Sequence, residues 1–147
     1  MPKVLAVDYG KKRVGLAISD EAGTFAFPLT TLEGLNSQAL QEALAALLPS
    51  KGVGHIVVGL PRNMDGSLGF MAEAIEAFCE RLRLTLASTP SLAHISLSLL
   101  DERLTSKLAE QSLRAVGKAP SRHKALIDQE AARNLLETYL RQQRGLH

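Results

Sequence analysis

The chain opens with three short apolar segments whose spacing and boundaries are typical of β-strands. They are residues 3–8 (KVLAVD), 13–19 (RVGLAIS) and 24–31 (TFAFPLTT), separated by YGKK and DEAG. The Gly and Asp residues of these two connections favour tight turns. This pattern predicts an antiparallel meander of three strands.

After Asn36 and Ser37 the hydrophobic period becomes helical. The apolar positions 40, 43, 44, 47 and 48 lie on one face of a helix that we expect to end before Pro49. A continuous apolar run then predicts a strand buried on both faces, at residues 55–60 (HIVVGL). The remaining expected elements are helices over 67–86, 104–116 and 125–142, with a fifth strand at 95–100 (ISLSLL).

Alternating strands and helices in the second half of the chain require right-handed crossovers and parallel strand pairs. We therefore expect one domain over residues 1–147, built on a mixed five-stranded α/β sheet flanked by helices. A chain of 147 residues with 46% hydrophobic residues buries roughly two thirds of its unfolded surface, which is enough to fold without disulfides or structural metal ions.

Composition narrows the class of protein further. A single cysteine, Cys79, excludes a disulfide scaffold and indicates a reducing, cytoplasmic compartment. No stretch reaches the roughly 20 apolar residues of a membrane span, and Asp8 comes too early for a signal peptide.

The net charge of +2 is unevenly spread: +3 over residues 1–13, −4 over 14–100 and +3 over 101–147. Basic ends that meet in the fold would suit phosphate, although an ordinary solvated charge mix gives the same totals.

Three acidic positions adjoin apolar surface, where a carboxylate is costly unless it is paired or binds a cation. Asp8 ends the most apolar strand, although capping the turn to Gly10 is an alternative explanation. Asp101 and Glu102 follow the fifth strand; because side chains alternate, only one of them can point toward Asp8. The acidic start of a helix explains the other.

Asp128 interrupts an apolar stripe on the last helix. Positions 128, 132, 135 and 139 share one helix face, and the other three are Ala132, Leu135 and Tyr139. A favourable interaction with the helix dipole is the structural alternative, but a solvent-facing position would serve that equally well.

Carboxylates from two strand ends and one helix suit a hard divalent cation, Mg²⁺ or Mn²⁺. The four histidines show no paired ligand spacing, and the presence of only one cysteine argues against a zinc site. This chemistry fits hydrolysis of phosphate esters by a metal pair about 4 Å apart.

Basic residues near these acids are candidates for binding phosphate. The segment GKAPSRHK, residues 117–124, is expected to be a basic loop, and GLPRNMDGS, residues 59–67, leads from a strand into a helix start. Plain solvated loop and a tight turn at Gly66 are the alternatives. The candidate substrate-binding residues are Lys11, Lys12, Arg13, Arg62, Arg103, Arg114, Lys118, Arg122 and Lys124.

Four ordered blocks resemble the YqgF family, also called RuvX, of Holliday junction resolvase-like and pre-16S ribosomal RNA nucleases. They are residues 7–20 (VDYGKKRVGLAISD), 57–67 (VVGLPRNMDGS), 100–110 (LDERLTSKLAE) and 127–140 (IDQEAARNLLETYL). The resemblance implies a ribonuclease H-like fold and a catalytic, metal-binding trio of Asp8, Glu102 and Asp128. It alone favours Glu102 over Asp101.

Three functions follow as hypotheses. The first is a metal-dependent endonuclease that processes the 5′ end of pre-16S ribosomal RNA, with precursor RNA or a ribosome precursor as partner. The second is a resolvase of branched DNA, which favours a homodimer over a monomer. The third is a noncatalytic nucleic-acid-binding factor in ribosome assembly. An ATP-binding site near Gly10 and Gly15 is disfavoured, because the proteins that it resembles close two such domains around the nucleotide.

Overall fold

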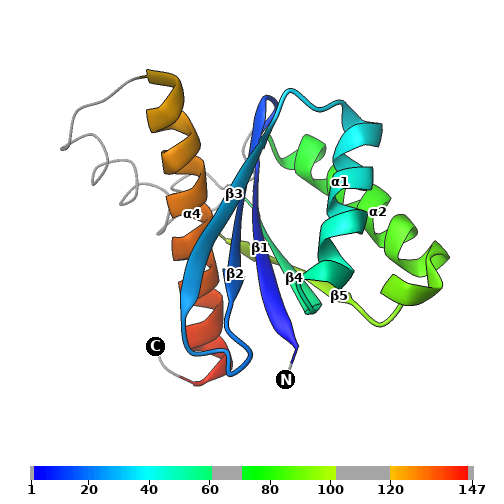
Figure 1. The fold of residues 1–147 in the computed structure, drawn as a ribbon, viewed down its shortest axis with the longest axis vertical. Coiled ribbons are helices and arrows are strands. Elements are labelled where there is room, and N and C mark those ends of the chain that lie inside the picture. The colour runs from blue at the N-terminus through cyan, green and yellow to red at the C-terminus, as the bar shows by residue number, and fades with distance from the viewer. Residues whose placement is uncertain (1, 61–70, 102–119, 146–147) are drawn as a thin grey trace.

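A computed structural model describes residues 2–60, 71–101 and 120–145 of the chain. These residues form one five-stranded sheet with helices on both faces (Figure 1). The strands are β1 (Lys3–Tyr9), β2 (Arg13–Ser19), β3 (Ala26–Glu33), β4 (Val53–Leu60) and β5 (Ser96–Asp101).

The sheet is mixed, as the pattern predicts. Its strand order is β3-β2-β1-β4-β5. The β1–β2 and β2–β3 pairs are antiparallel, whereas the β1–β4 and β4–β5 pairs are parallel. The central strand β1 therefore has a neighbour on each side and directs its carboxyl end, at Asp8 and Tyr9, to one edge of the sheet.

Helices cover the two faces unequally. Figure 1 shows α1 (Ser37–Ser50) and α2 (Ala72–Ser88) on one face and α4 (Pro120–Gln143) on the other. A short 3₁₀ helix, Pro90–Leu92, joins α2 to β5. Within the described segments, no helix combines the length and apolar character needed to cross a bilayer. The helix expected over residues 104–116 lies outside the described residues.

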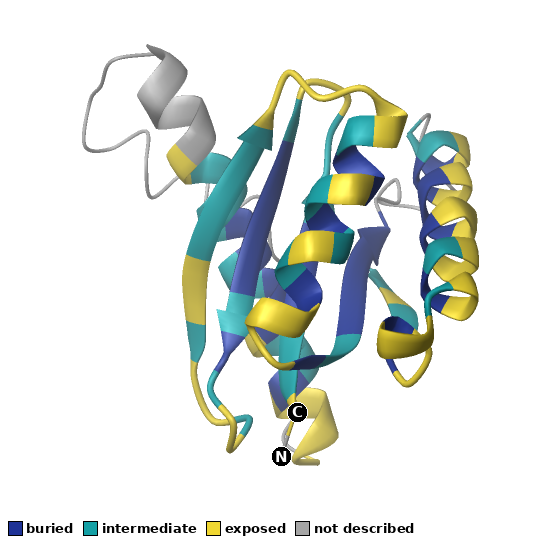
Figure 2. Cartoon of the chain, turned by 45° about the vertical axis from the view of Figure 1, so that its right-hand side comes forward, coloured by how far each residue is buried: buried dark blue, intermediate teal, exposed yellow. Residues whose placement is uncertain are grey.

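Each face of the sheet has its own hydrophobic core (Figure 2). Because strand side chains alternate, Leu5 and Val7 pack toward α1 and α2, whereas Ala6 packs toward α4. Small residues line the α4 side: Ala6 and Ala17 contact a cluster that includes Leu135 of the helix. Asp8 follows Ala6 by two positions and therefore lies on this α4 face.

Two predicted helix boundaries are wrong. Helix α1 continues through Pro49 to Ser50, so Pro49 lies in its last turn, and the helix ends one residue later. Helix α4 begins at Pro120 rather than at residue 125. Residues 120–124, expected to be loop, are thus helical; proline is favoured at a first helical position because its missing N–H has no partner there anyway.

The helix expected over 67–86 is α2, Ala72–Ser88, and the strand limits shift by one or two residues. β3 starts at Ala26 rather than at residue 24, because the Asp20 carboxylate accepts hydrogen bonds from the backbone N–H groups of Thr24 and Phe25, at 2.8 and 3.1 Å. β5 covers Ser96–Asp101, one residue later than expected.

Candidate active site

The first candidate ligand, Asp8, lies next to the carboxyl end of β1. It is half-buried, and its partner across the antiparallel β1–β2 ladder is Gly15. Directly opposed positions present their Cβ atoms on the same face, about 4.5–5.5 Å apart. Asp8 and the space above Gly15 therefore belong to one small region beneath α4.

Gly15 is where α4 approaches the sheet most closely. A methyl group at this position would overlap the backbone carbonyl of Asp128 and would lie only 2.9 Å from the Asp128 Cβ. Only a glycine lets the helix backbone rest here. Combining this contact with the strand pairing places the Cβ atoms of Asp8 and Asp128 within about 8 Å of each other. Two of the three predicted acids thus meet at one edge of the sheet.

Arg13 holds Asp128 from the start of β2. The Arg13 Nε donates a hydrogen bond to Oδ2 of Asp128 at 2.8 Å, and the two side chains are 30% and 19% exposed. Partial burial reduces solvent screening of the attraction between these two charges, at the cost of desolvating both. Arg13, named from sequence as a phosphate ligand, is placed by the structure on a carboxylate. Its contact with substrate stays a prediction.

The fifth strand presents Asp101 to the opposite face from Asp8. Leu100 packs with the α4 cluster, and Asp101 pairs with Leu60, which belongs to the core under α1 and α2. Alternation therefore directs Asp101 away from α4. Glu102 lies outside the described residues, so its role stays a prediction.

Asp8 and Asp128 fit a hard cation in the chemistry of their donors, since carboxylate oxygens are the ligands that Mg²⁺ and Mn²⁺ prefer. The described residues contain no group of three or more His, Cys, Asp or Glu side chains able to hold a metal. Of the predicted trio, this finding covers Asp8 and Asp128 but not Glu102, which lies outside the described residues.

Apart from Arg13, the basic candidates fall into three groups. Lys11 and Lys12 are exposed in the β1–β2 turn. Arg122 and Lys124 belong to the first turns of α4. The remaining four lie outside the described residues: Arg62, Arg103, Arg114 and Lys118.

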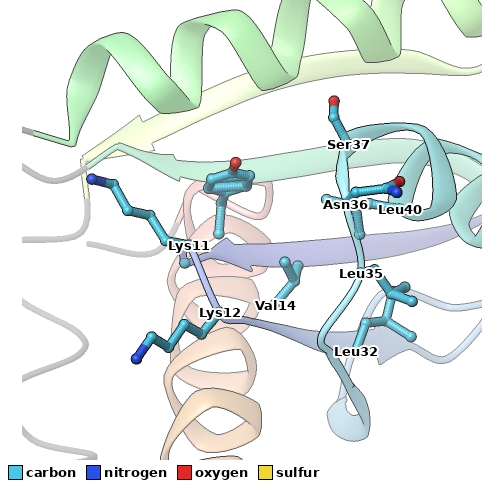
Figure 3. Close-up of a pocket in the computed structure, with 10 residues that line it drawn as sticks. Lys11, Lys12, Val14, Leu32, Leu35, Asn36, Ser37 and Leu40 are labelled. Carbon is cyan, nitrogen blue, oxygen red and sulfur yellow. The ribbon is translucent and has the colours of Figure 1, made fainter.

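A pocket of about 220 Å³ lies beside the same turn, on the α1 face of the sheet (Figure 3). Its lining combines apolar side chains of the sheet with polar groups of the turn and of the start of α1. The lining residues are Tyr9, Gly10, Lys11, Lys12, Val14, Leu32, Leu35, Asn36, Ser37 and Leu40. The sequence pattern did not indicate this pocket, because its residues come from two separate stretches of the chain, 9–14 and 32–40. Gly15 was also not predicted as a site residue, although a glycine inside a strand is a signal of close backbone approach.

Cys79 and His55 are residue types that often take part in catalysis, but here both side chains pack within the fold. The Cys79 side chain is buried in the larger core, and burial raises the pKa of its thiol to about 11, which disfavours a nucleophile. His55 lies between Ser96 Oγ and Ser98 Oγ, at 2.6 and 2.9 Å from its ring nitrogens, and stacks on Tyr139 of α4. Its burial lowers the pKa of the ring.

Comparison with known proteins resolves the family. The model of the RuvX family, described as a Holliday junction resolvase, matches residues 2–142. The chain belongs to the RuvX family. A RuvX relative from Chloroflexus aurantiacus, named "Putative pre-16S rRNA nuclease", is 41% identical over 137 residues, which cover 93% of this chain and 85% of the relative. A relative of the same name from Trichormus variabilis is 40% identical over 136 residues, covering 92% and 85%.

The fold of this RuvX chain matches known resolvases. RuvC from T. thermophilus, solved with a Holliday junction substrate, superposes with a TM-score of 0.58 at 10% identity, covering 99% of this chain and 97% of RuvC. The Fowlpox virus resolvase, also solved with junction DNA, gives a TM-score of 0.57 at 12% identity and covers 96% and 98%. The expected ribonuclease H-like fold, a mixed five-stranded α/β sheet flanked by helices, is confirmed.

Proposed function

We propose that this RuvX chain is a metal-dependent endonuclease that hydrolyses phosphodiester bonds in the precursor of 16S ribosomal RNA, at its 5′ end. The observation that carries the proposal is the meeting of Asp8 and Asp128 at Gly15, at an edge of the sheet beside the basic β1–β2 turn. The names of the curated relatives support the substrate class. The proposed nuclease acts in the cytoplasm, either free or on a ribosome precursor.

Asp8, Glu102 and Asp128 would hold the Mg²⁺ or Mn²⁺ ions. When bound, such ions supply activation of the attacking water and stabilisation of the leaving oxygen. The carboxylate side chains contribute oxygen donors at fixed positions, because β1 lies in the centre of the sheet and α4 is seated on Gly15.

Arg13 has a positioning role in this proposal. Its Nε–Oδ2 hydrogen bond fixes the orientation of the Asp128 carboxylate and offsets part of the repulsion between neighbouring acids. Lys11 and Lys12, exposed in the same turn, bind the backbone phosphates of the substrate.

A junction-resolving activity is the second candidate. The description of the family model and the fold shared with RuvC favour it. It would require a homodimer that presents two sites to a symmetric four-way junction, whereas RNA processing works with a monomer. The third candidate, a noncatalytic assembly factor, would bind nucleic acid without metal-dependent turnover.

A cleavage assay separates the three. A labelled precursor fragment and a synthetic four-way junction are incubated with the protein in Mg²⁺, in Mn²⁺ and in chelator, with Asp8→Asn as the matched control. We expect metal-dependent cleavage of the RNA that Asp8→Asn abolishes. Preferential cleavage of the junction would support the resolvase, and binding of RNA without turnover would support the assembly factor.

A further inference from the structure

The pocket beside the β1–β2 turn backs onto the candidate active site. Asp8 and Tyr9 are adjacent in β1, so their side chains point to opposite faces of the same sheet edge. Asp8 faces α4, whereas Tyr9 lines the pocket on the α1 side. The sheet itself lies between the two, where β1 ends and leads into the turn at Gly10, Lys11 and Lys12.

The size of the pocket limits what it can hold. At about 220 Å³ it exceeds the cavity of roughly 150 Å³ that accommodates a benzene ring. It is smaller than the sites of about 300–1,000 Å³ that enclose drug-sized ligands. One planar ring system with polar edges therefore fits, and a whole dinucleotide does not.

The floor of the pocket is apolar and fixed. Val14 and Leu40 are buried in the larger core, and the Tyr9 ring packs on Phe78 with their centroids 4.7 Å apart. Leu35 contributes a 40% exposed side chain to the lining. The N–H of Gly34 donates to the carbonyl of Lys12 at 3.2 Å, which ties the β1–β2 turn to the segment before α1.

Charge is concentrated at one side of this pocket. Figure 3 shows Lys11 and Lys12 on the side away from Asn36 and Ser37, with Val14 between the two groups. The two ammonium groups extend outward, away from Asn36. They are therefore placed to meet anionic groups that pass the pocket, rather than a group inserted in it.

We propose that the pocket receives one unpaired nucleobase of the substrate strand, while Lys11 and Lys12 bind phosphates next to that nucleotide. This inference rests on the proposed nuclease function and specifies its substrate: a strand with at least one unstacked base beside the cleaved bond. Bases splayed from single strands are the usual target of RNA recognition, and the π face of any base can stack on an aromatic side chain. A fully paired four-way junction offers no such base.

The absence of tryptophan from the chain provides a direct test. Leu35→Trp places the only tryptophan of the variant at the pocket, and Leu84→Trp, at a 62% exposed position of α2, is the matched control. Both are made in the Asp8→Asn background, so that the probe is not cleaved. The probes are an oligouridine of about 12 nucleotides, within the roughly 4–16 nucleotide range of single-strand sites, and an abasic oligomer with the same number of phosphates.

We expect the oligouridine to change the emission of Leu35→Trp in a saturable manner, whereas the abasic oligomer leaves it unchanged. Neither probe should affect Leu84→Trp. By fluorescence anisotropy of labelled probes, removal of the bases should weaken binding to the Asp8→Asn protein roughly 5- to 150-fold, the range given by stacking of one base. Leu35→Gln, a polar change at an exposed position, should reduce this difference.

The outcomes separate the pocket from the nuclease. Equal binding of both probes, or binding of oligouridine without a specific emission change at Leu35→Trp, would overturn the pocket proposal while leaving metal-dependent cleavage intact. Failure of every probe to bind, together with no cleavage of precursor RNA by the wild-type protein, would overturn both.

Discussion

Gly15→Ala is the sharpest test of how the site is built. The added methyl group would lie 2.9 Å from the Asp128 Cβ and would overlap the Asp128 carbonyl. Ordinary carbon contacts are about 3.5–4.0 Å, so α4 must move away from β2 by about 1 Å. The atoms in the way belong to the Asp128 backbone rather than to the end of a flexible side chain, so a side-chain rotation cannot relieve the clash.

Two measurable effects follow. Overpacking of this kind costs about 1–3 kcal/mol, which in a chain of this size lowers the melting temperature by about 2–12 °C. A displacement of about 1 Å in a catalytic group reduces the rate by about 100-fold. Circular dichroism melting and the metal-dependent cleavage rate measure the two effects on the same protein.

Gly52→Ala is the control for lost stability alone. Gly52 has a φ of 69° and no other group within 4 Å of the added methyl, so alanine costs about 1–2 kcal/mol of backbone strain. It lies before β4, remote from Asp128, and we expect its cleavage rate to equal that of the wild type. A Gly15→Ala protein with wild-type melting and cleavage would refute the reasoning about α4 and Asp128.

Three further predictions concern charge. Asp8→Asn should abolish cleavage because the amide weakens oxygen ligation of a hard cation, and the variant should unfold with equal or higher stability. Cleavage retained in both Mg²⁺ and Mn²⁺ would contradict the role of Asp8 as a metal ligand. Replacing Arg122 and Lys124 together by Ala should flatten the slope of log affinity against log salt by about 1–2 units and raise KM more than it lowers kcat; an unchanged slope would remove them from the phosphate surface. Because burial lowers the pKa of folded His55 below its usual 6.5, its contribution to stability is present above that value and is lost as the pH falls through the folded pKa. Melting of His55→Gln should therefore change less between pH 7.5 and pH 5 than that of the wild type, and parallel curves would contradict this.

The sheet was predictable from sequence because its signals are local. Each strand is an apolar run ended by turn residues. The runs that contain Ala6 and Ala17 are continuous rather than alternating, as expected of strands covered on both faces. The start of α4 was missed because basic, polar residues follow Pro120, and the helix there has no apolar period to recognise.

The site was only partly predictable for a different reason. Asp8 and Asp128 were recognised because each carboxylate adjoins apolar positions along its own element. The contact at Gly15 and the Arg13–Asp128 ion pair join elements 115 residues apart along the chain. No local pattern encodes such a pairing; it follows from the way in which α4 docks on β2. The contact of Arg13 with Asp128 was therefore not predicted, and its proposed contact with phosphate stays a prediction.

The separation of Arg13 and Asp128 by 115 residues also sets when the site can exist. During synthesis at about 5–20 residues per second, roughly 6–23 seconds pass between the first strands and the last helix. Throughout that interval Asp8 and Arg13 have been made, but Asp128 has not. A nascent chain next to ribosomal RNA therefore lacks the assembled candidate site, which forms only when α4 has left the ribosome and packed on Gly15.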